Sequence, residues 1–409
     1  MQPRIAKRVR QYSRPLTLLL LLALIPAHGH AVWTVTSPPG EKVLDFTMAP
    51  SLPSSLFATT RLNPDTSIWK SINSGVNWTM QPPLNRAYYG IGVKTDDENI
   101  VLAGVLGGQL ERSIDGGTSW TTIPTSASHD SWRIAFAISE PMTVYATGFT
   151  SGTTATGVVQ KSIDAGLTWS SFAIAGDANP AIVSLAVAPT DADTVYVGAI
   201  PDGVGDDGLY KTSDGGANWT YLSSLPLTEV DGLAVDPTDP NVVYAGSSGS
   251  GLIRRSVDGG VSWQILHDPF SGGVANFTSV RGIAINPSDR RIIYALGGSG
   301  ATRVIASTNC GIGWTNIDSS GIVIGQPSKA VIDTMNNFIY VLEDFLTTTI
   351  YREALLTVGS GSCSDQVGFP TSDGSGSIDY LLLVILGLLL TARYRRNHRA
   401  RISPNGNNA

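Results

Sequence analysis

The chain has 409 residues and a formal net charge of −6, and only 15% of its residues are charged. Its 44 glycines suit a fold with many tight turns. Outside residues 1–31 and 379–409, the body carries 17 basic and 32 acidic groups. Because nucleic acids and anionic lipids are bound through Lys and Arg that neutralise phosphates, this acidic body argues against both as its partners.

The N-terminal end has the pattern of an export signal. Five basic residues and no acidic residue precede the apolar run at residues 16–24. Small residues then stand two positions apart, as in Gly29-His30-Ala31. This order predicts a secretory signal peptide over residues 1–31, cleaved after Ala31. The alternative is a membrane anchor, for which the apolar run is short.

Six copies of one pattern, Ser/Thr-x-Asp/Asn-x-Gly-x-x-Trp, follow along the body, and their starts lie 42 to 51 residues apart. A period of about 40–50 residues built from short strands indicates a β-propeller with one blade per repeat. The recurring positions are Ser71, Asn73, Gly75 and Trp78; Ser113, Asp115, Gly117 and Trp120; Ser162, Asp164, Gly166 and Trp169; Thr212, Asp214, Gly216 and Trp219; Ser256, Asp258, Gly260 and Trp263; and Ser307, Asn309, Gly311 and Trp314.

A seventh blade is incomplete at the C-terminal side. Residues 338–341 and 349–353 repeat the second and third strands of the other blades, but no Trp-led fourth strand follows. Residues 32–36 supply a matching sequence, with Trp33 in the place of Trp120 and Trp314. We therefore expect an all-β fold: a single seven-bladed β-propeller of four-stranded antiparallel blades over residues 32–358, with the N-terminal strand closing the last blade. Closure of this kind leaves no unpaired strand at the seam.

The repeated polar residues have a structural explanation. An Asp or Asn side chain can hydrogen-bond the backbone amides of its own turn, and Gly permits a left-handed conformation. Asn73 and Asn309 replace Asp in two copies, and Asn keeps the hydrogen bonds without the charge. We therefore expect these residues to hold turns rather than to catalyse or to bind metal.

The motif at residues 113–120 and 256–263 resembles the BNR/Asp-box repeat, and the resemblance covers residues 32–358. The family includes sialidases, xyloglucan-degrading glycoside hydrolases, sortilin-type receptors and a photosystem II assembly propeller. The resemblance implies that the boxes lie at the periphery, away from a functional face on the opposite side. It does not choose among enzyme, receptor and assembly factor.

No repeated motif marks the functional residues on the opposite face, so the candidates there rest on residue type and position alone. Glycoside hydrolysis needs two carboxylates, for which Asp65, Asp130, Glu229 and Asp231 are the catalytic candidates. Candidate ligand-binding residues are Arg61, Tyr88, Tyr89, Trp132 and Arg281. Asp202, Asp206 and Asp207 could bind Ca²⁺ through oxygen ligands; no other cofactor is expected. The structural alternatives are solvated loop charges and aromatic rings packed under loops.

The C-terminal end carries a second signal. A Gly/Ser-rich linker (residues 359–377) precedes a hydrophobic segment (378–392) and a basic, cytoplasmic tail (393–409). This order resembles the GlyGly-CTERM sorting tails, which implies processing by a rhombosortase-like protease of a Gram-negative bacterium. It lacks the adjacent Gly-Gly pair, and a plain membrane anchor is the alternative. The two cysteines, Cys310 and Cys363, either form a disulfide or remain free thiols.

Together these features predict a protein exported across the inner membrane, at the cell surface or secreted, that binds a protein or glycan ligand without catalysis. The alternatives are a glycoside hydrolase of the xyloglucanase or sialidase type and an envelope assembly factor resembling the photosystem II propeller.

Overall fold

A computed structural model describes residues 33–39, 42–61, 66–82, 86–125, 133–149, 157–174, 181–200, 208–227, 229–271, 273–274, 276–298, 303–317, 327–343 and 349–358. The predicted signal peptide, linker, hydrophobic segment and basic tail lie outside these ranges. Within them, no helix has the length and hydropathy needed to cross a membrane.

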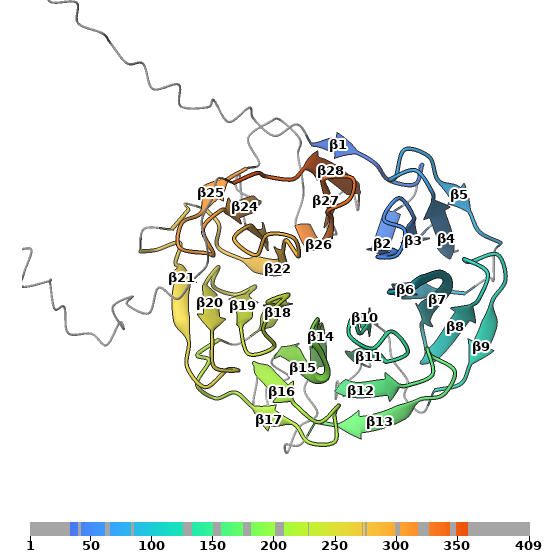
Figure 1. Cartoon of the computed structure of the whole chain (residues 1–409), viewed down its shortest axis with the longest axis horizontal. Helices are drawn as coiled ribbons and strands as arrows, with labels where there is room; N and C mark the ends of the chain where they lie inside the picture. Colours follow the sequence, from blue (N-terminus) through green and yellow to red (C-terminus); the bar gives the residue numbers. More distant parts are fainter. Residues whose placement is uncertain are drawn as a thin grey trace, which may run out of the picture.

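Seven sheets of four antiparallel strands stand around a central axis (Figure 1), which confirms the predicted seven-bladed propeller. In each blade the first strand lies innermost and the fourth outermost. Blades one to three are β2 (Lys42–Met48), β3 (Leu56–Arg61), β4 (Thr66–Ser71) and β5 (Thr79–Met80); β6 (Tyr88–Lys94), β7 (Asp97–Val105), β8 (Gln109–Ser113) and β9 (Thr121–Ile123); and β10 (Arg133–Phe136), β11 (Val144–Phe149), β12 (Gly157–Ser162) and β13 (Ser170–Ala173). Blades four and five are β14 (Ala181–Ala188), β15 (Asp191–Ile200), β16 (Leu209–Thr212) and β17 (Thr220–Tyr221); and β18 (Val230–Val235), β19 (Val243–Ser247), β20 (Ile253–Ser256) and β21 (Gln264–His267). Blades six and seven are β22 (Val280–Ile285), β23 (Ile293–Gly297), β24 (Val304–Ser307) and β25 (Thr315–Asn316); and β26 (Pro327–Asp333), β27 (Phe338–Glu343), β28 (Ile350–Ala354) and β1 (Thr34–Val35).

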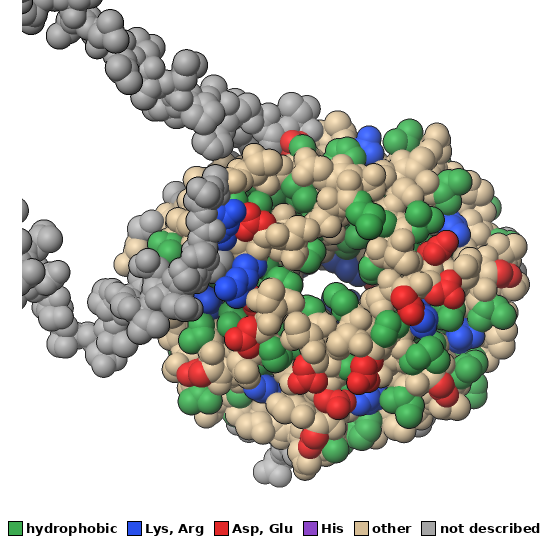
Figure 2. Space-filling view, in the orientation of Figure 1, with side chains coloured by type: hydrophobic (Ala, Val, Ile, Leu, Met, Phe, Trp, Pro, Cys, Tyr) green, Lys and Arg blue, Asp and Glu red, His purple; other side chains and the backbone are tan. Residues whose placement is uncertain are grey.

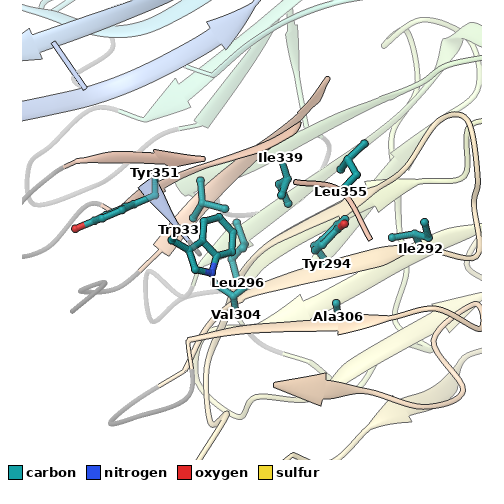
Figure 3. Packing of buried hydrophobic residues seen from close by; sticks show 10 residues of the cluster. Trp33, Ile292, Tyr294, Leu296, Val304, Ala306, Ile339, Tyr351 and Leu355 are labelled. Atoms are coloured by element: carbon teal, nitrogen blue, oxygen red, sulfur yellow. The ribbon is translucent and has the colours of Figure 1, made fainter. Parts of the chain in front are cut away.

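The N-terminal strand closes the ring, as the sequence predicted. Strand β1 pairs antiparallel with β28, with Thr34 opposite Arg352 and Val35 opposite Tyr351. Trp33 is only 3% exposed and packs in a cluster that joins β28 to the strands of blade six (Figure 3). The carbonyl of Thr36 accepts a hydrogen bond from the indole of Trp78 in blade one, at 2.6 Å. A segment of four residues therefore contacts blades six, seven and one.

Each Asp-box is a turn between the third and fourth strands that holds itself together. The Ser or Thr hydroxyl donates to the Asp or Asn two residues later, at 2.7–3.1 Å, and accepts from the backbone amide of the box Gly, at 2.8–2.9 Å. The Asp or Asn side chain accepts from the backbone amide four residues later, at 2.8–2.9 Å. Hydrogen bonds from the side chain and then the backbone amide of Ser119 lower the pKa of Asp115 to about 2, and those of Asn218 do the same for Asp214. These carboxylates are therefore ionised and occupied by their own turns.

Basic side chains connect neighbouring blades through the boxes. Lys70 at the end of β4 donates to the carbonyl of Gly116 in the next box, at 3.2 Å, and Arg112 does the same to Ala165, at 2.8 Å. Across the seam, Arg352 of β28 donates to the carbonyl of Ser74, at 2.8 Å. The seam between blades seven and one is thus bonded like the junctions between consecutive blades.

We predict that replacing Trp33 by Ala lowers the free energy of unfolding of the whole ring by about 3–5 kcal/mol, because a large buried side chain is lost at the seam. Denaturant unfolding followed by Trp fluorescence and circular dichroism measures the change. Val35→Ala is the matched control, since Val35 is 66% exposed in the same strand. A Trp33→Ala protein with the unfolding midpoint of the control would show that the seam does not depend on this contact.

Candidate functional site

A cavity of about 370 Å³ lies at the ring axis and is lined mainly by the innermost strands. Figure 2 shows a narrow central opening with Lys or Arg atoms inside it. Five charged residues line the cavity, each from a different blade: Asp45, Arg133, Asp231, Arg281 and Lys329.

A bulge near the start of the inner strands directs residues toward this cavity. The pairing of the first with the second strand shifts register around Leu44, Tyr89, Val183, Asp231, Arg281 and Ser328, at equivalent points of six blades. A bulge inserts one residue and reorients its side chain. The box turns lie at the other end of these strands, because they bond the hairpin turn between the first and second strands, as Ser74 N does to Ser54 O at 2.9 Å. The bulges are therefore at the edge opposite to the boxes.

Asp45 and Lys329 form the first of two charged groups in the cavity. Asp45 is 5% exposed and accepts from Lys329 Nζ at 2.6 Å. Its carboxylate also accepts the backbone amides of Phe46 and Ile91, at 2.9 and 3.0 Å. The carboxylate thus bridges blades one, two and seven, and it neutralises the charge of Lys329.

Asp231, Arg133 and Arg281 form the second group. Burial raises the pKa of Asp231, while a hydrogen bond from Ser248 and the positive charges of Arg281 and Arg133 oppose that rise. Ser248 also donates to Glu229 Oε2, at 3.2 Å. Glu229 has φ 58°, in the left-handed region that non-glycine residues rarely adopt. The positive charges of two arginines therefore act on one partly buried carboxylate whose ionisation is disfavoured, and a second carboxylate hydrogen-bonds the same Ser248.

The structure places the sequence candidates unequally. Asp231 and Arg281 line the cavity, whereas Arg61 is exposed at the end of β3 and is not among the lining residues. Tyr88 corrects the expectation of an exposed ring: it is 1% exposed and packs in the core of blades one and two. Tyr89 is half-buried in the β6 bulge. Candidates outside the described residues are Asp65, Asp130, Trp132, Asp202, Asp206 and Asp207.

Asp45 and Lys329 were not predicted as site residues, and Arg133 was considered only as one of several arginines that could face the ring axis. The available signal was a charged residue near the start of an otherwise apolar first strand, as in Val43-Leu44-Asp45-Phe46. This signal does not recur from blade to blade, because the equivalent positions in other blades carry different residues. The repeat pattern therefore could not identify it.

Most of the metal and disulfide candidates lie outside the described residues. Among the described residues, no group of three or more His, Cys, Asp or Glu is placed to hold a metal ion. The predicted Ca²⁺ ligands are not among those residues. Cys310 is disulfide-bonded; Cys363, the only other cysteine, lies beyond the described part of the chain, so their pairing stays a prediction.

A second pocket, of about 550 Å³, lies between the outer strand of blade five and the box of blade six, and its wall includes His267. This histidine is 2% exposed, and its Nδ1 lies 3.0 Å from the carbonyl of Gly251. Nε2 accepts from the backbone amide of Val274, also at 3.0 Å. Both ring nitrogens are thus engaged by the backbone, and burial lowers the pKa of the ring. His267 is therefore a neutral core residue rather than a general base.

Comparison with known proteins extends only to the fold. No protein-family model and no curated protein sequence matches the chain. Among solved structures, YCF48 bound to a D1 peptide is similar at 13% identity and a TM-score of 0.56, over 80% of this chain and 97% of that one. An ancestral GH74 enzyme is similar at 19% identity and a TM-score of 0.61, over 78% of this chain but only 46% of the enzyme. Sqt1 from Chaetomium thermophilum, bound to the N-terminus of the ribosomal protein L10, is similar at 12% identity and a TM-score of 0.53, over 78% and 91% of the two chains.

We predict that His267 makes the fold weaker in mild acid. Its folded-state pKa is lowered, so the unfolded chain takes up the proton first, and stability present above the usual His pKa of about 6.5 is lost as the pH falls below it. The measurement is the free energy of unfolding between about pH 7.5 and pH 5 for the wild type and His267→Gln. The variant should show a flatter dependence on pH, because Gln can both donate and accept without titrating. Equal slopes for the two proteins would contradict the assignment.

Proposed function

We propose that this protein is a non-catalytic binding propeller that holds an anionic segment of a protein ligand in the central cavity. The observation that carries the proposal is the presence of two arginines, Arg133 and Arg281, on the cavity wall with the partly buried carboxylate of Asp231. Arginine is suited to this task, since its planar guanidinium binds a carboxylate through two parallel hydrogen bonds.

The charge balance of the cavity favours an anion. The lining carries three basic side chains, Arg133, Arg281 and Lys329, and two acidic ones, Asp45 and Asp231. Lys329 is paired with Asp45 at 2.6 Å. The surrounding body has an acidic excess of 15 groups outside residues 1–31 and 379–409. A cationic cavity in an acidic body concentrates the attraction for an anion at the ring axis.

Two structural neighbours support a peptide as the ligand. YCF48 has been solved with a D1 peptide, and Sqt1 with the N-terminus of ribosomal protein L10. The predicted signal peptide and sorting tail support an exported protein, at the cell surface or secreted. An envelope assembly role, of the kind that the photosystem II propeller suggests, would be one use of such a peptide site.

We predict that Arg281→Gln and Arg133→Gln each weaken peptide binding by roughly 10–100-fold, the range expected when a hydrogen-bonded charge is lost. The purified full chain is first screened on an array of random peptides, and affinities for the best binders are measured by calorimetry. Peptides whose acidic side chains are replaced by amides should also lose affinity. Lys42→Gln is the control, because it removes one positive charge from an exposed position at the start of β2. Equal affinities for the control and both arginine variants would contradict the proposal.

A glycoside hydrolase is the second candidate, favoured by the carboxylates of Glu229 and Asp231. A partly buried carboxyl with a raised pKa near a second carboxylate is the arrangement of a general acid and its partner. The propeller of an ancestral GH74 enzyme has a similar fold, although this chain matches less than half of that enzyme.

We predict that the full chain releases no reducing ends from xyloglucan above the level of its Asp231→Asn variant. A reducing-sugar assay on both proteins makes the comparison. If the wild type hydrolyses xyloglucan and the variant is slower by roughly 100-fold or more, as loss of a general acid would cause, the hydrolase replaces the binding proposal. Lys42→Gln again serves as the control for purification and handling.

A further inference from the structure

The edge of the ring that carries the Asp-boxes is unusually apolar. Seventeen large hydrophobic side chains are exposed among the described residues, and twelve of them lie on box turns or on the hairpin turns between first and second strands. All these turns share the edge opposite to the bulges of the inner strands. Large exposed apolar areas on soluble proteins commonly mark interaction sites.

The apolar side chains are densest on blade three. Ile138 and Met142 of its first hairpin turn are 59% and 49% exposed, and Ile163 and Leu167 of its box are 69% and 52% exposed. The two turns are joined by a backbone hydrogen bond from Ala165 to Met142, at 2.8 Å. We call these four side chains the blade-three patch. Because the turns are held together, the patch is presented by a fixed frame.

Carboxylates border the patch. Asp164 lies in the same box, and hydrogen bonds from Thr168 and Ser162 outweigh burial, so that its pKa is lowered to about 2 and it is ionised. Glu140 is exposed on the same hairpin turn as Met142. Further ionised box aspartates, Asp115 and Asp214, lie on the boxes of neighbouring blades.

We propose that the blade-three patch is a docking surface for a protein partner with an apolar face bordered by Lys or Arg. Such a partner would bury the four aliphatic side chains and pair its cations with Asp164 and Glu140, which is the usual arrangement of an apolar centre with a polar rim. Charge argues against the other occupants. A second copy would bring like-charged box turns together, and an anionic bilayer would bring phosphates against these carboxylates.

The box of blade four lacks the exposed aliphatic side chains and shows which substitutions a box can accept. At the positions of Ile163 and Leu167 its box has Ser213 and Ala217, and it forms the same turn hydrogen bonds. Ile163→Ser with Leu167→Ala therefore copies a box that folds. Val257→Ser with Val261→Ala removes an equally exposed pair from blade five and is the matched control.

The probe is a fluorescent helical peptide with one face of Leu and one face of Lys, and the full chain is titrated into it. A peptide with Glu in place of Lys is measured in the same way for comparison. We expect the Lys peptide to bind, salt to weaken it, and the blade-three variant to lose affinity by roughly tenfold or more. The blade-five control and Arg281→Gln should leave its affinity unchanged, which separates this surface from the cavity. Equal affinity for the two peptides or an equal loss in the blade-five control would overturn the proposal. Binding to anionic vesicles, or self-association, that depends on Ile163 and Leu167 would also overturn it.

Discussion

The pairing of β1 with β28 is the constraint on which the rest of the structure depends. Each blade of the ring buries its faces only against its two neighbours, so an open seam would expose two faces at once. Trp33 and Thr36 close this seam from one short segment, through burial on one side and a hydrogen bond to Trp78 on the other. Arg352 donates a hydrogen bond to a box carbonyl of the neighbouring blade, as Lys70 and Arg112 do at other junctions. The central cavity exists only because this circle is complete.

In this ring, the residues that repeat from blade to blade hold the turns, and the residues that vary line the cavity. The box positions barely change from blade to blade, because each must supply the same hydroxyl, the same acceptor and the same glycine to one turn. The bulge positions change completely, from Leu44 and Val183 to Asp231 and Arg281. The same backbone bulge thus presents a different side chain to one cavity from five of the seven blades. This is how a symmetric scaffold can produce an asymmetric binding site.

This division explains what the sequence could predict. The blades and the role of Trp33 were predictable because seven similar segments support them. The box turns were predictable because six copies of one motif support them. The cavity was only partly predictable, since Asp45 and Lys329 are 284 residues apart in the sequence and come together only when the ring closes. Tyr88 was a ligand-binding candidate because it stands near a predicted loop, where a ring can face either solvent or core, and both alternatives were left open. Its burial depends on the packing of blade two against blade one.

The two edges of the ring therefore differ in chemistry, and this difference limits how ligands can be arranged on them. The bulge edge directs Arg133 and Arg281 into a cavity, whereas the box edge presents aliphatic side chains beside ionised carboxylates. An anionic segment attracted by the cavity is repelled by the box edge, and a basic apolar partner has the opposite preference. The two proposed ligands would occupy different surfaces of one ring, so binding of one would not compete with binding of the other.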